Sequence, residues 1–267
     1  YLRENRPDWL AGVTAGPLAH RPVELRKHVP AEYPIRQYPD LTHTVRCQYP
    51  VPWWDLTWEM THGREASNPR PMDYAEIIRL QTPATTGFLS YSDGVHDDVN
   101  KVIWSALAWD LDGDTRDILV DYARVFFGPD VAEQAADGIR AFEWNWQGPV
   151  ADNSGIIATL ALWQELERTH PELGVNWRWN MALLRAYYDA YVYHRLRYER
   201  SLESESMAVL GTAQALGATP AMDEALGVLR RATSDYTHPE LRDRVIELCQ
   251  TLNEQIGLQT SVEKYGA

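Results

Sequence analysis

The densest group of chemically useful side chains lies in residues 91–101, which read YSDGVHDDVNK. An apolar run precedes this group and an apolar helical pattern follows it, so we expect it at the C-terminal end of a strand. Parallel α/β barrels build their active sites from polar side chains at such strand ends. The members that can donate, accept or transfer protons are Tyr91, Asp93, His96, Asp97, Asp98, Asn100 and Lys101.

Carboxyl groups in pairs suit the hydrolysis of a glycosidic bond, in which one protonates the leaving oxygen and the other is nucleophile or base. Neighbouring carboxylates also separate their pKa values by repulsion. We therefore assign Asp93, Asp97, Asp98 and His96 as candidate catalytic residues. A second interpretation stays open, in which Asp97 and Asp98 favour a helix N-terminus by their charge and the Asp93–Gly94 pair forms a turn. His96 would then only fix that turn.

Arg46 is a candidate substrate contact on a predicted strand at residues 41–49, whose β-branched and aromatic residues favour that conformation. An inward arginine could bind a substrate carboxylate through two hydrogen bonds, which would suit a uronic or sialic acid. A structural ion pair is the alternative.

Four further residues are candidate substrate contacts: Trp53, Asp55, Tyr91 and Asn100. The loop that follows residue 49 is rich in tryptophan, and a flat indole face can stack on a sugar ring while its N–H bonds a polar partner. The amide of Asn100 could hold a hydroxyl group. Ordinary packing of the loop explains the tryptophans equally well.

The composition limits the classes of partner. The formal net charge of −13 argues against nucleic acid, since phosphate binding needs a basic surface. No apolar run has the length of a membrane span and no secretory signal is visible, so we expect no membrane partner and assign no compartment. The 11 Trp and 14 Tyr against 4 Phe suit either sugar stacking or a helical core with polar rims. A homo-oligomer is a possible assembly.

No cofactor or metal is predicted. Cys47 and Cys249 are far apart in the sequence, and we interpret both as buried thiols. Residues 110–114 read DLDGD, but an EF-hand loop needs glycine at its sixth position, where this chain has Thr115. A turn that leads into an N-cap is the better interpretation.

The chain divides into two parts that differ in their predicted secondary structure. Residues 1–110 alternate strand-like and helix-like segments, which predicts βα units and a parallel sheet. The expected strands are residues 9–13, 41–49 and 86–92, with helices at 22–28 and 71–80. Residues 111–267 read as helices separated by Gly-Pro and Pro breaks, beginning with an N-cap at Asp114. The expected helices are 115–127, 130–146, 154–169, 175–216, 220–233 and 239–256.

Three βα units are too few for a closed barrel, which needs eight. The expected fold is therefore α/β plus α: residues 1–110 form the C-terminal units of a partial (β/α)8 TIM-type barrel, and residues 111–267 form an α-helical domain. The chain would then be part of a larger barrel enzyme.

Four segments carry a resemblance to known proteins: residues 38–50, 68–71, 91–101 and 121–128. They resemble the last barrel strands and trailing helical domain of bacterial glycoside-hydrolase-like proteins of the hexosaminidase and α-glucuronidase type. The resemblance implies a carbohydrate substrate and hydrolysis of an O-glycosyl bond. In such barrels the acid/base pair usually follows an earlier strand, so a non-catalytic carbohydrate-binding or assembly module is the alternative.

Overall fold

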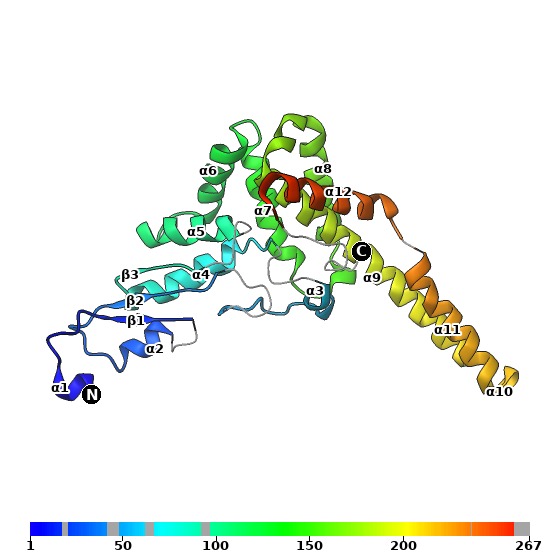
Figure 1. Cartoon of the computed structure of the whole chain (residues 1–267), viewed down its shortest axis with the longest axis horizontal. Helices are drawn as coiled ribbons and strands as arrows, with labels where there is room; N and C mark the ends of the chain where they lie inside the picture. The colour runs from blue at the N-terminus through cyan, green and yellow to red at the C-terminus, as the bar shows by residue number, and fades with distance from the viewer. Residues whose placement is uncertain (18–20, 42–47, 62–66, 92–96, 236, 259–267) are drawn as a thin grey trace.

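The structure is a computed structural model, which describes residues 1–17, 21–41, 48–61, 67–91, 97–235 and 237–258. It is mainly helical, with 69% of residues in helices and 5% in strands. Figure 1 shows a small sheet near the N-terminus, a helical body and a projecting arm. We use "body" for residues 67–192 and 239–256, and "arm" for residues 193–234.

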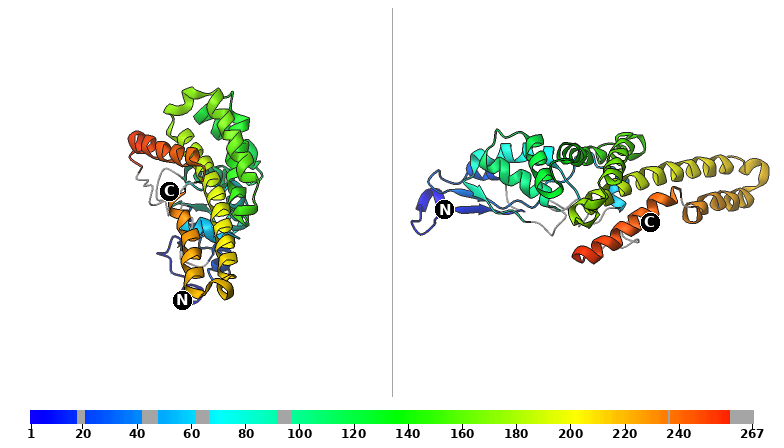
Figure 2. Two further views of the ribbon diagram at one scale, coloured as in Figure 1. Left: turned by 90° about the vertical axis from the view of Figure 1, so that its right-hand side faces the viewer. Right: turned by 90° about the horizontal axis from the view of Figure 1, so that it is seen from above.

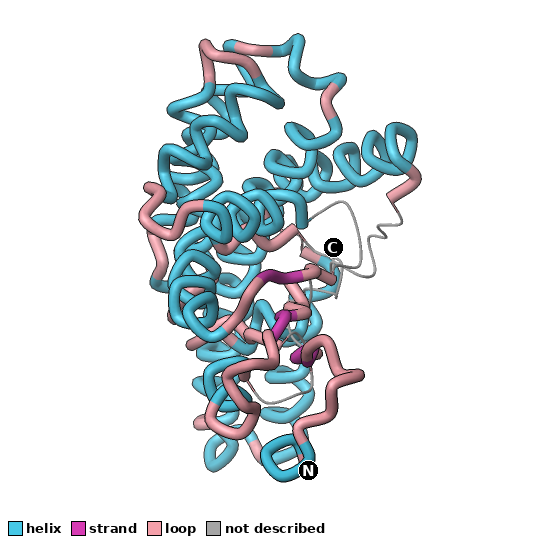
Figure 3. The backbone as a smooth tube through the Cα atoms, turned by 90° about the vertical axis from the view of Figure 1, so that its left-hand side faces the viewer, coloured by secondary structure: helices cyan, strands magenta, loops and turns pink. Residues whose placement is uncertain are grey.

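Three parallel strands lie side by side in the order β1-β2-β3 (Figure 3). They are β1 (Val13–Ala15), β2 (Ile35–Gln37) and β3 (Gly87–Phe88). Val13 pairs with Ile35, and Arg36 pairs with Gly87. Ile35 is fully buried in a small apolar cluster with Val29, whereas Arg36 is exposed on the opposite face. One face of the sheet therefore packs against this apolar cluster, whereas the face that carries Arg36 is exposed.

The expected (β/α)8-barrel segment is wrong. The strands found in the described residues have only two or three residues each, and a barrel is not present. The first expected strand, residues 9–13, reaches strand conformation only at Val13. In the second, Leu41 and Tyr49 lie outside any strand and residues 42–47 lie outside the described residues.

The prolines on either side of β2 explain why the sequence analysis did not predict this strand. Pro34 and Pro39 bound residues 35–37, and a short segment between prolines reads as a loop, because proline cannot donate to a strand ladder. The strand still pairs with β1, because Pro34 takes part as an acceptor: the Val13 amide donates to the Pro34 carbonyl oxygen at 2.9 Å.

The helices account for most of the fold. Two short ones are α1 (Leu2–Asn5) and α2 (Pro22–Arg26). Those that follow are α3 (Leu56–Thr61), α4 (Pro71–Gln81), α5 (Asp98–Trp109), α6 (Thr115–Phe127), α7 (Ala132–Asn145), α8 (Gly155–Thr169), α9 (Trp177–Leu210), α10 (Ala213–Leu216), α11 (Ala218–Ser234) and α12 (Pro239–Ile256). The predicted N-cap at Asp114 is confirmed, since its carboxylate accepts from the amides of Arg116 and Asp117.

Aromatic packing builds the core of the body. The rings of Phe142 and Trp163 stack with centroids 5.4 Å apart, and Trp163 meets Trp179 edge-on at 5.3 Å. Gly138 gives Trp163 its space, because a Cβ there would lie 2.8 Å from the indole nitrogen. Large flat side chains and one missing side chain therefore fix how α7, α8 and α9 pack.

Helix α9 joins the body to the arm. Its 34 residues make it about 50 Å long at 1.5 Å per residue. Residues 179–192 are continuously buried, whereas beyond them only Leu202 and Ser206 are buried in this helix. Helix α12 packs near its first half and α11 folds back along its second half (Figures 1 and 2).

Candidate functional site

Asn100, whose amide also donates to Asp97, binds a neighbouring stretch of backbone near the start of α5. The Asn100 amide nitrogen donates to Asp97 Oδ1 at 2.7 Å and to the Asn68 carbonyl oxygen at 2.8 Å. Asn100 Oδ1 accepts from the Arg70 amide at 2.7 Å. Asp97 is 3% exposed and Asn100 1%. The hydrogen-bonding groups of Asn100 are thus used to hold residues 68–70, which lead into α4.

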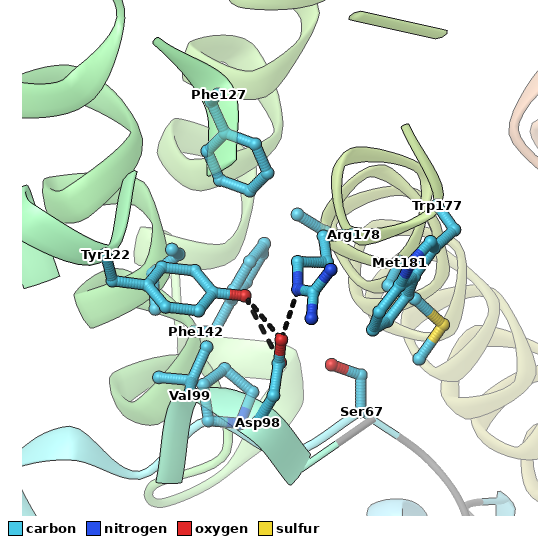
Figure 4. A pocket seen from close by; sticks show the side chains of 12 residues that line it. Ser67, Asp98, Val99, Tyr122, Phe127, Phe142, Trp177, Arg178 and Met181 are labelled. Atoms are coloured by element: carbon cyan, nitrogen blue, oxygen red, sulfur yellow. Dashed lines mark hydrogen bonds and ion pairs between the residues drawn. The ribbon is translucent and has the colours of Figure 1, made fainter. Parts of the chain in front are cut away.

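Asp98 lies in a small pocket between α5, α6 and α9 (Figure 4). It accepts from the Tyr122 hydroxyl at 3.1 Å and pairs with Arg178 Nε. The Arg178 guanidinium in turn lies between two rings, 4.1 Å from the centroid of Trp177 and 3.9 Å from that of Phe126. Burial is the main cause that raises the pKa of Tyr122, so it stays a neutral donor.

The pocket around Asp98 has a volume of about 30 Å³, which is room for about one water molecule. Its walls include Ser67, Phe127 and Met181 (Figure 4). The pocket is too small for a sugar ring, and its carboxylate already has a cationic partner. As described, Asp98 ties three helices together.

The other predicted residues divide into two groups. Asp93, His96 and Arg46 lie outside the described residues. Tyr91 forms a single parallel bridge with Asp40 beyond the ends of β2 and β3, and its ring meets Tyr38 edge-on at 6.2 Å. The catalytic and substrate-contact roles assigned to these residues stay predictions.

Asp55 and Trp53 lie in a loop that contacts the turn after α7. Asp55 Oδ1 accepts from the Thr57 amide at 2.7 Å and Oδ2 from the Val150 amide at 3.1 Å, so both oxygens serve the backbone. Trp53 has φ 57°, a left-handed conformation that costs a bulky residue about 1–3 kcal/mol. Its side chain is 87% exposed. The loop thus presents an indole to solvent at a cost in backbone strain.

A larger cavity lies between α4 and the loop of residues 48–52. Its volume of about 360 Å³ falls in the range of small-molecule sites. Its lining mixes polar and apolar side chains: Arg21, Gln48, Tyr49, Pro50, Pro52, Arg70, Asp73, Glu76, Ile77, Leu80 and Gln81. We call this the α4 cavity.

Gln81, which lines the α4 cavity, has a buried and unsatisfied acceptor. The residue is 6% exposed, and its Oε1 has no hydrogen-bond partner among the described residues. A buried acceptor without a donor costs about 1–3 kcal/mol. Across the cavity, Gln48 Oε1 accepts from the Asp40 amide at 3.2 Å, which leaves the Gln48 amide nitrogen as a donor. The wall therefore offers the Gln48 donor to a bound molecule, whereas the Gln81 oxygen is closed off from the cavity in the conformation described.

The charges of the α4 cavity balance. Arg70 pairs with Asp73 at 2.7 Å, and the Arg70 side chain is 3% exposed. Arg21 and Glu76 are exposed, and neither side chain has a hydrogen bond or ion pair within the described part of the chain. Tyr49 accepts from Gln37 at 2.8 Å, and burial raises its pKa to about 12, so it is neutral. Two cations and two carboxylates thus line a cavity of no net charge.

Glu143 fixes the helix that forms one wall of the cavity. Its two carboxylate oxygens accept from the amides of Met72 and Asp73, each at 2.8 Å, in the first turn of α4. Burial is the main cause that raises the pKa of Glu143 to about 7. A carboxyl group with that pKa could in principle act as a general acid, but it faces backbone amides and does not line the α4 cavity.

The sequence analysis missed the residues of this cavity. A signal existed, because residues 73, 76, 77, 80 and 81 follow the i, i+3, i+4, i+7, i+8 spacing of one helix face. That face mixes Glu76 and Gln81 with Ile77 and Leu80, whereas a face that packs into a core is uniformly apolar. Nothing in the sequence pointed to Arg21, which comes from a distant segment.

The comparisons with known proteins gave no relative: no protein-family model, no curated protein and no solved structure matches this chain. Within the described residues, no group of three or more His, Cys, Asp or Glu side chains could hold a metal ion. Among the described helices, none combines the length and the apolar character that a membrane span requires.

Proposed function

We propose that this protein binds carbohydrate in the α4 cavity. The observation that carries the proposal is a cavity of about 360 Å³ with two amide side chains, Gln48 and Gln81, in its wall. The amide nitrogen of Gln48 can donate to a sugar hydroxyl. The Oε1 of Gln81 is buried without a partner, and a turn of its amide group would let it accept from the same hydroxyl, which is both donor and acceptor. Binding would remove the cost of the unsatisfied acceptor.

The composition of the wall favours a sugar over other small molecules. Pro50, Pro52, Ile77 and Leu80 offer apolar contact for the C–H face of a ring, and planar polar groups stand beside them. A phosphorylated ligand is disfavoured, because Arg70 is already paired with Asp73, and among the described residues of the wall Arg21 is the one remaining cation. A neutral polyol fits a cavity whose charges balance.

Trp53 supports an oligosaccharide rather than a single sugar. It directly follows Pro52 of the cavity wall, and its indole is 87% exposed. The flat apolar face of an indole suits stacking against a sugar ring. We expect Trp53 to contact a second ring of a chain whose first ring occupies the cavity.

The test is isothermal titration with a panel of neutral oligosaccharides: cello-, xylo-, manno- and chito-oligomers. We expect one class to bind, and Gln81→Leu to weaken it about tenfold, because a hydrogen bond to a buried acceptor is worth about 1–1.5 kcal/mol. Gln134→Leu, an exposed position on α7, is the matched control and should bind like the wild type. Absence of binding across the panel, or equal affinity of the Gln81→Leu variant, would refute the proposal.

Hydrolysis of the bound glycan is a second proposal. It rests on the carboxylate-rich segment of the sequence, residues 93–98, which begins five residues after the end of β3. Release of reducing ends from the oligosaccharide that binds best would support an enzyme. Binding without any release would support a carbohydrate-binding module instead.

A further inference from the structure

Helix α11 carries an apolar stripe that its own chain does not cover. Met222 and Leu226 are each 49% exposed and Leu229 is 43% exposed. Their i, i+4, i+7 spacing places them on one side of the helix. The side that packs on α9 is a different one, formed by the buried residues Ala221, Ala225 and Val228. The stripe is therefore additional to the seam that holds the arm together.

The links between α11 and α9 lie away from this stripe. Arg231 pairs with Glu205 of α9 at 3.0 Å. At 100° per residue, Arg231 lies about 140° around the helix from Leu226. Figures 1 and 2 show the arm projecting from the body, with α11 beside α9. The stripe is thus open to a partner from outside this chain.

Two opposite charges border the stripe on the same flank. Asp223 and Arg230 lie about 60° and about 40° from Leu226, both in the same direction around the helix. Both are exposed, and neither side chain has an ion pair or hydrogen bond within the part of the chain that is described. One end of the stripe is therefore acidic and the other basic.

We propose that α11 is the contact surface of a homodimer in which two copies of this helix pack antiparallel. A two-fold axis at Leu226 sets residues before this position against residues after it in the partner. Asp223 is three residues before Leu226 and Arg230 is four after it, so each Asp223 meets the Arg230 of the other copy. The two-fold axis keeps the shared flank on one side, so two ion pairs form along it.

The length of the stripe sets the expected strength. From Met222 to Leu229 it extends about 10 Å along the helix, so the buried area is at the low end for specific interfaces. We therefore expect a dimer that dissociates in the micromolar range. A parallel two-fold arrangement would place the charged flanks of the two copies on opposite sides of the interface, so neither ion pair would form.

The test is analytical ultracentrifugation of the full chain from low micromolar to several hundred micromolar concentration. The wild type should associate, and Asp223→Arg or Arg230→Asp alone should weaken association about tenfold, since two pairs are lost at about 0.7 kcal/mol each. The double variant should return to within about twofold of the wild type. Val125→Gln on α6, 75% exposed and outside the arm, is the control and should behave as the wild type.

A mixture of the two single variants gives the sharpest result. One copy then carries only arginine at positions 223 and 230 and the other only aspartate, so the mixture should associate more tightly than either variant alone. A monomeric wild type at all concentrations, or a double variant no better than the single ones, would overturn the proposal. Circular dichroism confirms that each variant keeps its helices, so a loss of association cannot be mistaken for unfolding.

Discussion

The body and the arm solve the problem of helix packing in different ways. The body buries large aromatic rings and even a complete ion pair, Arg185 with Asp189, whose side chains are 1% and 0% exposed. The arm joins its two helices through a narrow seam of small residues and leaves leucine and methionine in solvent. The comparison predicts that the body contributes more to the stability of the chain than the arm does.

The buried ion pair of the body gives the largest expected difference. Arg185 also donates to the Phe142 carbonyl oxygen at 2.9 Å, and its guanidinium lies 3.5 Å from the ring centroid of Trp146. Arg185→Met would leave Asp189 as a buried charge without its cation and should lower the free energy of unfolding by about 3–5 kcal/mol.

The matched change in the arm is Arg231→Met, which removes an exposed pair and should cost less than about 1 kcal/mol. Urea denaturation of the two variants measures both values. Equal losses in the two variants would show that the arm is held as firmly as the body.

Glu143, which lies in the body, should make the free energy of unfolding depend on pH. Its pKa is about 7 in the folded chain against an ordinary value of 4.5, so the folded state binds the proton more tightly. Stability from this group is fully present below about pH 4.5 and is lost as the pH rises through about 7, by about 3 kcal/mol at most.

The check is urea denaturation at about pH 5 and about pH 8, with Glu143→Gln as the control that cannot titrate. The wild type should lose more stability than the variant between the two conditions. An identical change in both proteins would show that another group is responsible. Burial lowers the pKa of His194, which acts in the opposite direction and is common to both proteins.

Two glycine-to-alanine substitutions, one in the body and one in the arm, should change stability in opposite directions. Gly138→Ala in α7 would set a Cβ 2.8 Å from the Trp163 indole nitrogen and should cost about 1–3 kcal/mol. Gly227→Ala in α11 meets nothing within 4 Å and should stabilise the arm by about 0.5–1 kcal/mol, because alanine favours helix. Thermal unfolding followed by circular dichroism compares them. A destabilised Gly227→Ala variant would mean that the arm packs more tightly than described.

The helical part could be predicted because its signals are local. Asp114 bonds the amides two and three residues ahead of it, and Gly128 ends α6 in a conformation, φ 102°, that favours glycine. A parallel sheet and a strand at β3 were predicted, but the central strand β2 could not be, because a three-residue strand between Pro34 and Pro39 has no pattern long enough to distinguish it from a loop.

The candidate site shows the same limit. Asp97 and Asn100 were singled out by composition, but the hydrogen bonds of Asn100 reach Asn68 and Arg70, which are about 30 residues away in the chain. The α4 cavity joins three separate segments, and the missing partner of Gln81 appears only when the surrounding atoms are placed. Neither the long-range hydrogen bonds nor the residues that line the cavity can be inferred from their positions in the sequence.

The continuity of α9 has a mechanical consequence. No loop separates the buried residues 179–192 from the outer part of this helix, so the arm has no hinge in this segment and can turn only with the body or by bending the helix. The outer half is about 25 Å long, so a tilt of about 10° at the body displaces the arm's tip by about 4 Å. The helix is thus a lever that converts a small angular change in the body into a displacement at the tip.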